Sequence, residues 1–111
     1  MRAVSGDDAD TGRRAERARR RAARQIVGEY HEQQLRELLE RVRDGFTRHD
    51  RGEIDPFELD DLIHHYKRAA QKLWSFCGSS EADWERAANA LAFMRENGES
   101  HDWWDAARPK G

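Results

Sequence analysis

The run GEIDPFELDDLIHHYKRAAQKLWSFC, from Gly52 to Cys77, decides the predicted fold. Asp55, Pro56 and Glu58 are typical of a helix start, with an aspartate N-cap, a proline in the first turn and a glutamate that completes a capping box. Gly78 is a typical residue just past a helix end. The sequence therefore predicts one helix over residues 56–77. Its buried stripe follows the 3.6-residue period and comprises Leu59, Leu62, Ile63, Tyr66, Ala69, Ala70, Leu73 and Cys77.

Two further helices are expected on either side of this one. The first runs from about residue 29 to residue 48, because Leu35, Leu38, Leu39, Val42 and Phe46 fall on one helical stripe. The other begins after Ser80, an N-cap followed three residues later by Asp83, and ends near Gly98. Since only a few residues separate the second helix from the third, we expect these two to form an antiparallel hairpin. The second helix is expected to be the longest, and no segment has a strand pattern.

Charge is distributed unevenly along the 111 residues. Residues 13–24 contain seven arginines and one glutamate, a net charge of +6, whereas residues 25–111 contain 12 Lys/Arg and 18 Asp/Glu, a net charge of −6. We expect an arginine-rich arm over residues 1–27 that is disordered or a frayed helix, a helical domain over residues 28–99, and a Trp-containing tail over residues 100–111. The predicted fold class is all-α: a small three-helix unit with a helical hairpin, a basic flexible N-terminal arm and a short C-terminal helical tail.

The arm is the first candidate functional segment. Its cations could neutralise phosphates of a nucleic acid, a contact that is independent of base sequence and weakened by salt. The arm has no aromatic residue for base stacking, and no large apolar side chain before Ile26 ties it to the body. The alternatives are a solvated extension or an upstream extension of the reading frame. The candidate phosphate contacts are Arg13, Arg14, Arg17, Arg19, Arg20, Arg21 and Arg24.

Four tryptophans are many for a chain in which 38% of the residues are charged. Trp84 falls on the inner stripe of the third predicted helix. Trp74 lies beside the stripe of the second, and Trp103 and Trp104 lie in the tail. Because aromatic residues are enriched at interface centres, Trp74, Trp103 and Trp104 are a candidate partner surface. The alternative is that the tail folds back and its indoles cover the helices.

The loop before the second helix resembles the second half of an EF-hand, with Gly52 at the sixth position and Glu58 at the twelfth. Counting back, however, Thr47, His49 and Arg51 stand where calcium would need oxygen ligands. We therefore expect a plain helix–loop–helix connection and no calcium site.

The remaining ligand-type residues do not form a recognisable metal or catalytic motif. His64 and His65 point about 100° apart on a helix, so they cannot chelate one ion from the same face. Cys77 is the only cysteine and lies in an apolar stripe, which favours a core position over a nucleophile. We predict no enzyme, no cofactor, no metal site and no small-molecule substrate.

The segment from Gly52 to Cys77 is similar to segments of small, uncharacterised helical proteins of actinobacteria. That resemblance implies a bacterial, cytoplasmic protein and brings no activity with it. A single cysteine fits a reducing compartment, and no apolar run reaches the roughly 20 residues of a membrane span. The predicted function is a non-enzymatic helical protein–protein interaction module that self-associates or binds a protein partner. The alternative is a nucleic-acid-associated accessory protein that uses the arm.

Overall fold

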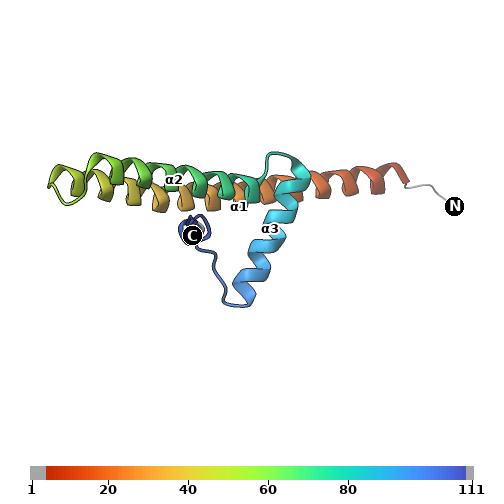
Figure 1. Cartoon of the computed structure of the whole chain (residues 1–111). Helices are drawn as coiled ribbons and strands as arrows, with labels where there is room; N and C mark the ends of the chain where they lie inside the picture. The colour runs from red at the N-terminus through yellow and green to blue at the C-terminus, as the bar shows by residue number, and fades with distance from the viewer. Residues whose placement is uncertain (1–4, 110–111) are drawn as a thin grey trace.

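The computed structural model describes residues 5–109, and all regular structure in that range is helical (Figure 1). Four helices follow in order: α1 (Ser5–Asp50), α2 (Pro56–Cys77), α3 (Glu81–Glu96) and α4 (Trp103–Ala106). The predicted all-α class is confirmed. None of these helices is long and apolar enough to cross a membrane.

The loop between α1 and α2 is built by backbone hydrogen bonds that end one helix and by side chains that begin the next. Gly52 has a φ of 76°, and the amides of Gly52 and Glu53 bond back to the carbonyls of His49 (3.0 Å) and Arg48 (2.9 Å). This is a Schellman motif, in which glycine adopts the left-handed conformation at low cost. The glycine that resembles an EF-hand position thus serves here as a helix terminator.

The predicted start of α2 is present in atomic detail. The Glu58 amide donates to the Asp55 carboxylate (2.7 Å), and the Asp55 amide donates to the Glu58 carboxylate (3.1 Å). These reciprocal bonds satisfy two backbone donors that the first turn of a helix leaves free. At the other end, Gly78 has a φ of 73°, and a Cβ there would stand 2.2 Å from the Cβ of Asp83. Glycine is therefore required at the turn into α3.

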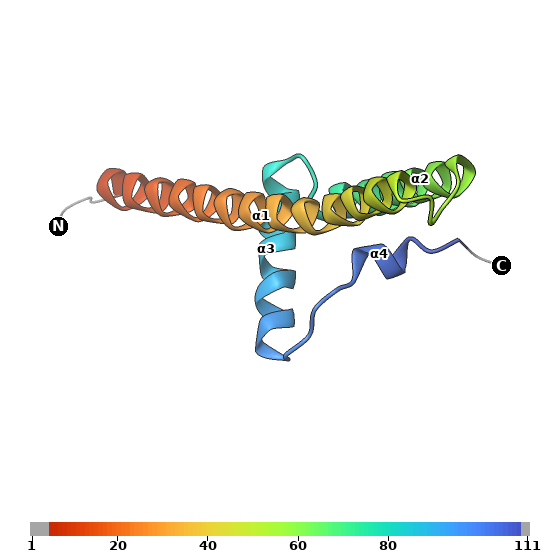
Figure 2. The same ribbon diagram turned by 90° about the vertical axis from the view of Figure 1, so that its left-hand side faces the viewer.

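The antiparallel hairpin is formed by α1 and α2, and the prediction that α2 pairs with α3 is wrong. Figures 1 and 2 show α3 leaving the α1–α2 pair at a steep angle, and its packing is mainly against α1. A short turn limits the distance between two helices but leaves their crossing angle free, and the tight Gly78 turn redirects the chain. The longest helix is α1, with 46 residues, rather than α2 with 22.

The arm is part of α1, because the helix passes through residues 13–28 without a break. The domain boundary expected after residue 27 therefore falls inside one helix. Ala23 and Val27 are buried in the body, so small side chains tie the end of the arm down where a large one was expected to be necessary. Of the residues expected to be disordered, residues 1–4 lie outside the described range.

The molecule is elongated, with extents of 81 × 24 × 20 Å. Its radius of gyration is 20.4 Å, whereas a compact domain of this length has one of about 13 Å. The core is correspondingly small and lies where α1, α2, α3 and α4 meet. Its buried members are Val27, Leu38, Ala69, Leu73, Cys77, Ala87, Trp103 and Ala107.

Candidate functional site

Trp103 belongs to the core and is not available to a partner. Its side chain is 8% exposed, its Nε1 donates a hydrogen bond to the Tyr30 hydroxyl (2.8 Å), and its ring lies 5.4 Å from that of Phe76. Burial raises the pKa of Tyr30, although the Trp103 hydrogen bond opposes that effect. This pair joins the tail to α1 across 73 residues of sequence.

Trp104 is held between α1 and α2. It stacks on His65 with ring centroids 3.8 Å apart, and the Arg41 guanidinium lies 5.2 Å from its centroid on the other helix. His65 also donates from Nε2 to the Trp104 carbonyl (2.7 Å), and Arg68 donates to the Ala107 carbonyl (3.1 Å). The tail therefore folds back onto the helices, and both of its tryptophans contact them, as the alternative to a partner surface predicted.

Trp74 is different, because 58% of its side chain is exposed. Its ring meets that of His31 at 5.5 Å. On α2, Trp74 is nine residues from His65, and nine residues turn a helix by about half a revolution. Trp74 and the tail-covered His65 therefore lie on opposite sides of α2.

The same division applies to α1. Leu39 and Phe46 are 49% and 48% exposed, and each points roughly 140–200° away from Arg41, which lies under the tail. Both views show α4 and most of α3 on one side of the α1–α2 pair, whereas the first turn of α3 starts level with the pair (Figures 1 and 2). The other side, which we call the open face, carries exposed Leu39, Phe46 and Trp74 between apolar side chains that the described chain covers only in part. It comprises Leu35, Leu39, Val42 and Phe46 of α1 with Ile63, Ala70 and Trp74 of α2.

The sequence analysis placed five apolar residues of α1 on one helical stripe, yet only Leu38 among them is buried. The spacing of the apolar residues in the sequence already indicated that part of this stripe faces away from the core. Leu35, Leu39, Val42 and Phe46 are spaced by four, three and four residues, the pattern of a second, coiled-coil-like seam. A helix with two apolar seams is typical of one that has two partners.

Six of the seven arm arginines lie within an arc of about 120° on α1, taking 100° per residue. They form the arginine stripe, Arg13, Arg14, Arg17, Arg20, Arg21 and Arg24, while Arg19 lies on another side. Among the described residues, Arg14, Arg17, Arg19 and Arg21 form no ion pair. Arg13 pairs with Asp10 (2.9 Å), which leaves most of the positive charge of the stripe uncompensated.

The inner end of the stripe meets α3. Arg20 lies 3.6 Å from the Glu81 carboxylate, and the Arg24 guanidinium lies 5.0 Å from the centroid of Trp84. These residues, together with Arg17 and Arg21, line a shallow groove of about 260 Å³. The tertiary structure thus places an aromatic ring beside the arm, which the arm's own sequence lacks.

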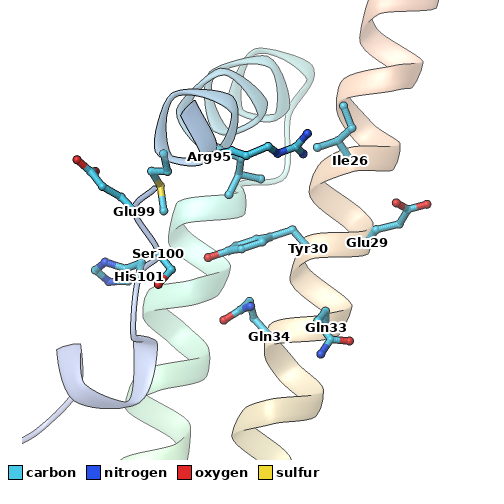
Figure 3. Close-up of a pocket in the computed structure, with 11 residues that line it drawn as sticks. Ile26, Glu29, Tyr30, Gln33, Gln34, Arg95, Glu99, Ser100 and His101 are labelled. Atoms are coloured by element: carbon cyan, nitrogen blue, oxygen red, sulfur yellow. The ribbon is translucent and has the colours of Figure 1, made fainter. Parts of the chain in front are cut away.

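A larger cavity, of about 490 Å³, lies between α1, the C-terminal half of α3 and the linker to α4 (Figure 3). Its apolar lining comes from Ile26, Tyr30, Leu91 and Met94. In Figure 3 the Tyr30 ring extends from α1 toward Ser100, and the Arg95 side chain extends toward Ile26. Carboxylates, amides and a guanidinium are dispersed around the rim, so the cavity does not bring like groups together for one ligand.

The cysteine and histidine side chains that could be reactive are buried or bonded within the fold. Cys77 is buried, and burial raises the pKa of its thiol to about 11, so it is protonated at neutral pH. His64 bonds to the Asp60 carbonyl one turn earlier (2.8 Å). In the described part of the chain, no group of three or more His, Cys, Asp or Glu side chains is arranged to hold a metal ion.

Comparison of the chain with protein-family models, with curated protein sequences and with solved structures finds no significant match.

Proposed function

We propose that this chain is a non-enzymatic helical interaction module, that its partner is a second copy of itself, and that the open face is the contact surface. One observation carries the proposal: α4 and most of α3 lie on the same side of the α1–α2 hairpin, and Leu39, Phe46 and Trp74 remain about half exposed away from them. Two such faces packed together would make a four-helix bundle, the usual way in which helical hairpins bury a second apolar seam.

The size of the core supports this assignment. The buried set contains few large side chains, and small domains without disulfides or metals often gain their remaining stability by association. Completing the burial of three half-exposed side chains on each copy is worth about 1 kcal/mol per side chain, or about 6 kcal/mol in total. Association costs about 4–15 kcal/mol, so the apolar contact alone supports weak binding.

The side chains with potential reactivity favour a structural role over catalysis. His65 is used for stacking and hydrogen bonding in the tail contact, and Cys77 is a buried thiol. A free buried thiol is also consistent with the reducing cytoplasm of a bacterium, where we place the protein.

Light scattering coupled to size exclusion tests the proposal. Leu39→Glu and Phe46→Glu place a charge in the open face, and each should convert a dimer into a folded monomer, because both side chains are already half in solvent. Phe93→Glu is the matched control, since Phe93 is 61% exposed on α3, outside the open face. A wild-type protein that stays monomeric at high concentration would rule out self-association.

The arginine stripe favours a second function, contact with the phosphates of a nucleic acid. Its six cations share one side of α1, and a helix that presents positive charge in this way can follow a polyanion. Truncation before residue 26 is a poor test, because Ala23 and Arg24 contact the body. Arg14, Arg17 and Arg21, which form no ion pair in the described chain, can instead be replaced by glutamine.

The expected result is weaker binding to duplex DNA and a salt dependence of log K that is less steep by about 0.9 for each phosphate that the variant no longer neutralises. The control replaces three cations outside the stripe, Arg36, Arg43 and Lys72, with glutamine and should leave the salt dependence unchanged. Failure of the unmodified chain to bind at low salt would exclude this second function.

A further inference from the structure

We infer that two copies of this chain pack antiparallel, open face on open face, so that the inner end of the arginine stripe of each, Arg21 and Arg24, lies against the acidic loop end of the other. The loop end is residues 48–61, which connect α1 to α2 and begin α2. This arrangement rests on the self-association proposed above and specifies its orientation, its register and the ionic contacts at both ends.

The open face and the arginine stripe are parts of one continuous surface of α1. Eighteen residues make five full turns of an α-helix, so residues 18 apart point in the same direction. Arg17 and Leu35 are related in this way, as are Arg21 and Leu39 and also Arg24 and Val42. A second copy lying along the apolar part of α1 therefore continues toward Arg21 and Arg17, beside the start of α3, which contacts Arg20 and Arg24.

The loop end carries the complementary charge. Its residues include two arginines and six acids, Asp50, Glu53, Asp55, Glu58, Asp60 and Asp61, for a net charge of −4. Asp50 and Asp60 are 80% and 67% exposed, and each lies on the open-face side of its helix by the 100° rule. Glu53 pairs only loosely with Arg48 and Arg51, at 3.9 Å each.

The register follows from the centre of the apolar seam. On α1 that seam runs from His31, which contacts Trp74, to Phe46, so its midpoint falls between Leu38 and Leu39. In an antiparallel pair with its two-fold axis at this midpoint, residues whose numbers add to about 77 face each other. Phe46 then meets His31 and Val42 meets Leu35. Glu53, at the tip of the loop end, reaches Arg24, and Arg21 lies less than one helical turn beyond it.

Electrostatics selects the antiparallel orientation over the parallel one. A parallel pair would place the two arms side by side, with +6 against +6, and the two loop ends together, with −4 against −4. The antiparallel pair replaces both repulsions with attractions, which is how charge commonly fixes the orientation of packed helices.

The area available for contact also supports an interface that extends from the open face onto the arm and the loop end. The apolar seam is about 22 Å long and two helices wide, which gives about 450 Å² on each copy, whereas a stable interface buries about 800 Å² per partner. Contact between arm and loop at both ends lengthens the interface to about 50 Å and supplies the missing area. Neither surface is large enough alone.

Charge reversal tests the ionic contact. Arg21→Glu and Glu53→Lys should each weaken the dimer by about tenfold or more, and the double variant should restore it, because the pair is then re-formed with opposite signs. The wild-type dimer should also dissociate more readily as salt is added. Loss of the dimer in the double variant, or no effect of either single change, would overturn the ionic contact.

Cysteine cross-linking tests the orientation. Asp50→Cys places thiols about 35 Å apart in the antiparallel dimer, so this variant alone should not cross-link, and neither should Gly28→Cys. A Cβ at Gly28 meets nothing within 4 Å, and a mixture of the two variants should give disulfide-linked heterodimers. The native Cys77, being buried, serves as the silent background. Cross-linking of each single variant with itself would show a parallel dimer and overturn the inference.

The outcomes separate this inference from the proposal beneath it. A monomeric wild type removes both. A dimer that is broken by Leu39→Glu but is indifferent to Arg21→Glu keeps the open face as an interface and overturns the arm–loop contact. If Arg21→Glu leaves the dimer intact and abolishes DNA binding, then the partner of the stripe is a nucleic acid and the inference is wrong.

Discussion

Truncating Trp103 to alanine should detach the tail and destabilise the whole protein. The side chain is 8% exposed and joins α4 to α1 through the hydrogen bond to Tyr30. Because α4 has only four residues, it has no stability of its own and is held in place by such contacts. We therefore expect the remaining contacts of the tail to weaken together with this one.

The magnitude follows from the buried area. A buried tryptophan removes about 150–250 Å² from water, worth about 4–6 kcal/mol at 25 cal/mol per Å², and Trp→Ala changes in cores cost about 3–5 kcal/mol. Since domains of this size are stable by only about 5–15 kcal/mol, the melting temperature should fall by about 10–20 °C. Tyr30→Phe removes only the acceptor for the Trp103 N–H group and should cost about 1–3 kcal/mol.

Urea unfolding followed by circular dichroism measures both values at a fixed protein concentration. Phe93→Ala is the control, because that side chain is 61% exposed and its loss should change the free energy of unfolding by less than about 1 kcal/mol. If Trp103→Ala costs no more than Phe93→Ala, the tail is not docked in solution, and Trp103 returns to the candidate partner surface.

Three further outcomes follow from burial and pKa shifts. Leu73→Ala, at a fully buried position, should cost about 2–5 kcal/mol, and Leu62→Ala, at a half-buried one, clearly less, when their free energies of unfolding are compared. The Cys77 thiol, buried and with its pKa raised to about 11, should react with a thiol reagent only at the rate of unfolding, so rapid labelling of the native protein would contradict its placement. Burial lowers the pKa of His31 below its ordinary 6.5, so the unfolded chain takes up the proton first and stability should fall as the pH drops below about 6.5; a His31→Gln variant with an unchanged pH dependence of the melting temperature would refute this origin.

The helix signals in the sequence were reliable because they are local. Asp55, Pro56 and Glu58 fix the start of α2 through atoms at most three residues apart, and Ser80 begins α3 in the same way, accepting a hydrogen bond from the Asp83 amide (3.2 Å). Gly52 and Gly78 end helices for an equally local reason, since each adopts a positive φ that other residues reach only at a cost.

The choice of partners was not local, and only the tertiary structure settled it. Helical periodicity predicts which face of α1 carries Leu38, Leu39 and Phe46. Which of these side chains is buried depends on where the other helices pack against that face. Here α4 and most of α3 lie on one side of the hairpin. Leu38 is therefore buried, while Leu39 and Phe46 are left on the open face.

The tryptophans and the arm illustrate the same limit. Nothing in the tail sequence distinguishes Trp103, whose indole finds the Tyr30 hydroxyl 73 residues away, from Trp104, which finds His65. The small side chains of Ala23 and Val27 hold the end of the arm against the body, and their size allows a close approach that their hydrophobicity alone would not predict. The sequence by itself determined the end of α1 and the bounds of α2 and α3, because capping and turn energies act over a few residues, whereas the start of α1, which has no such signal, was misplaced. Only the tertiary structure decided which faces meet, because burial is a property of the assembled whole.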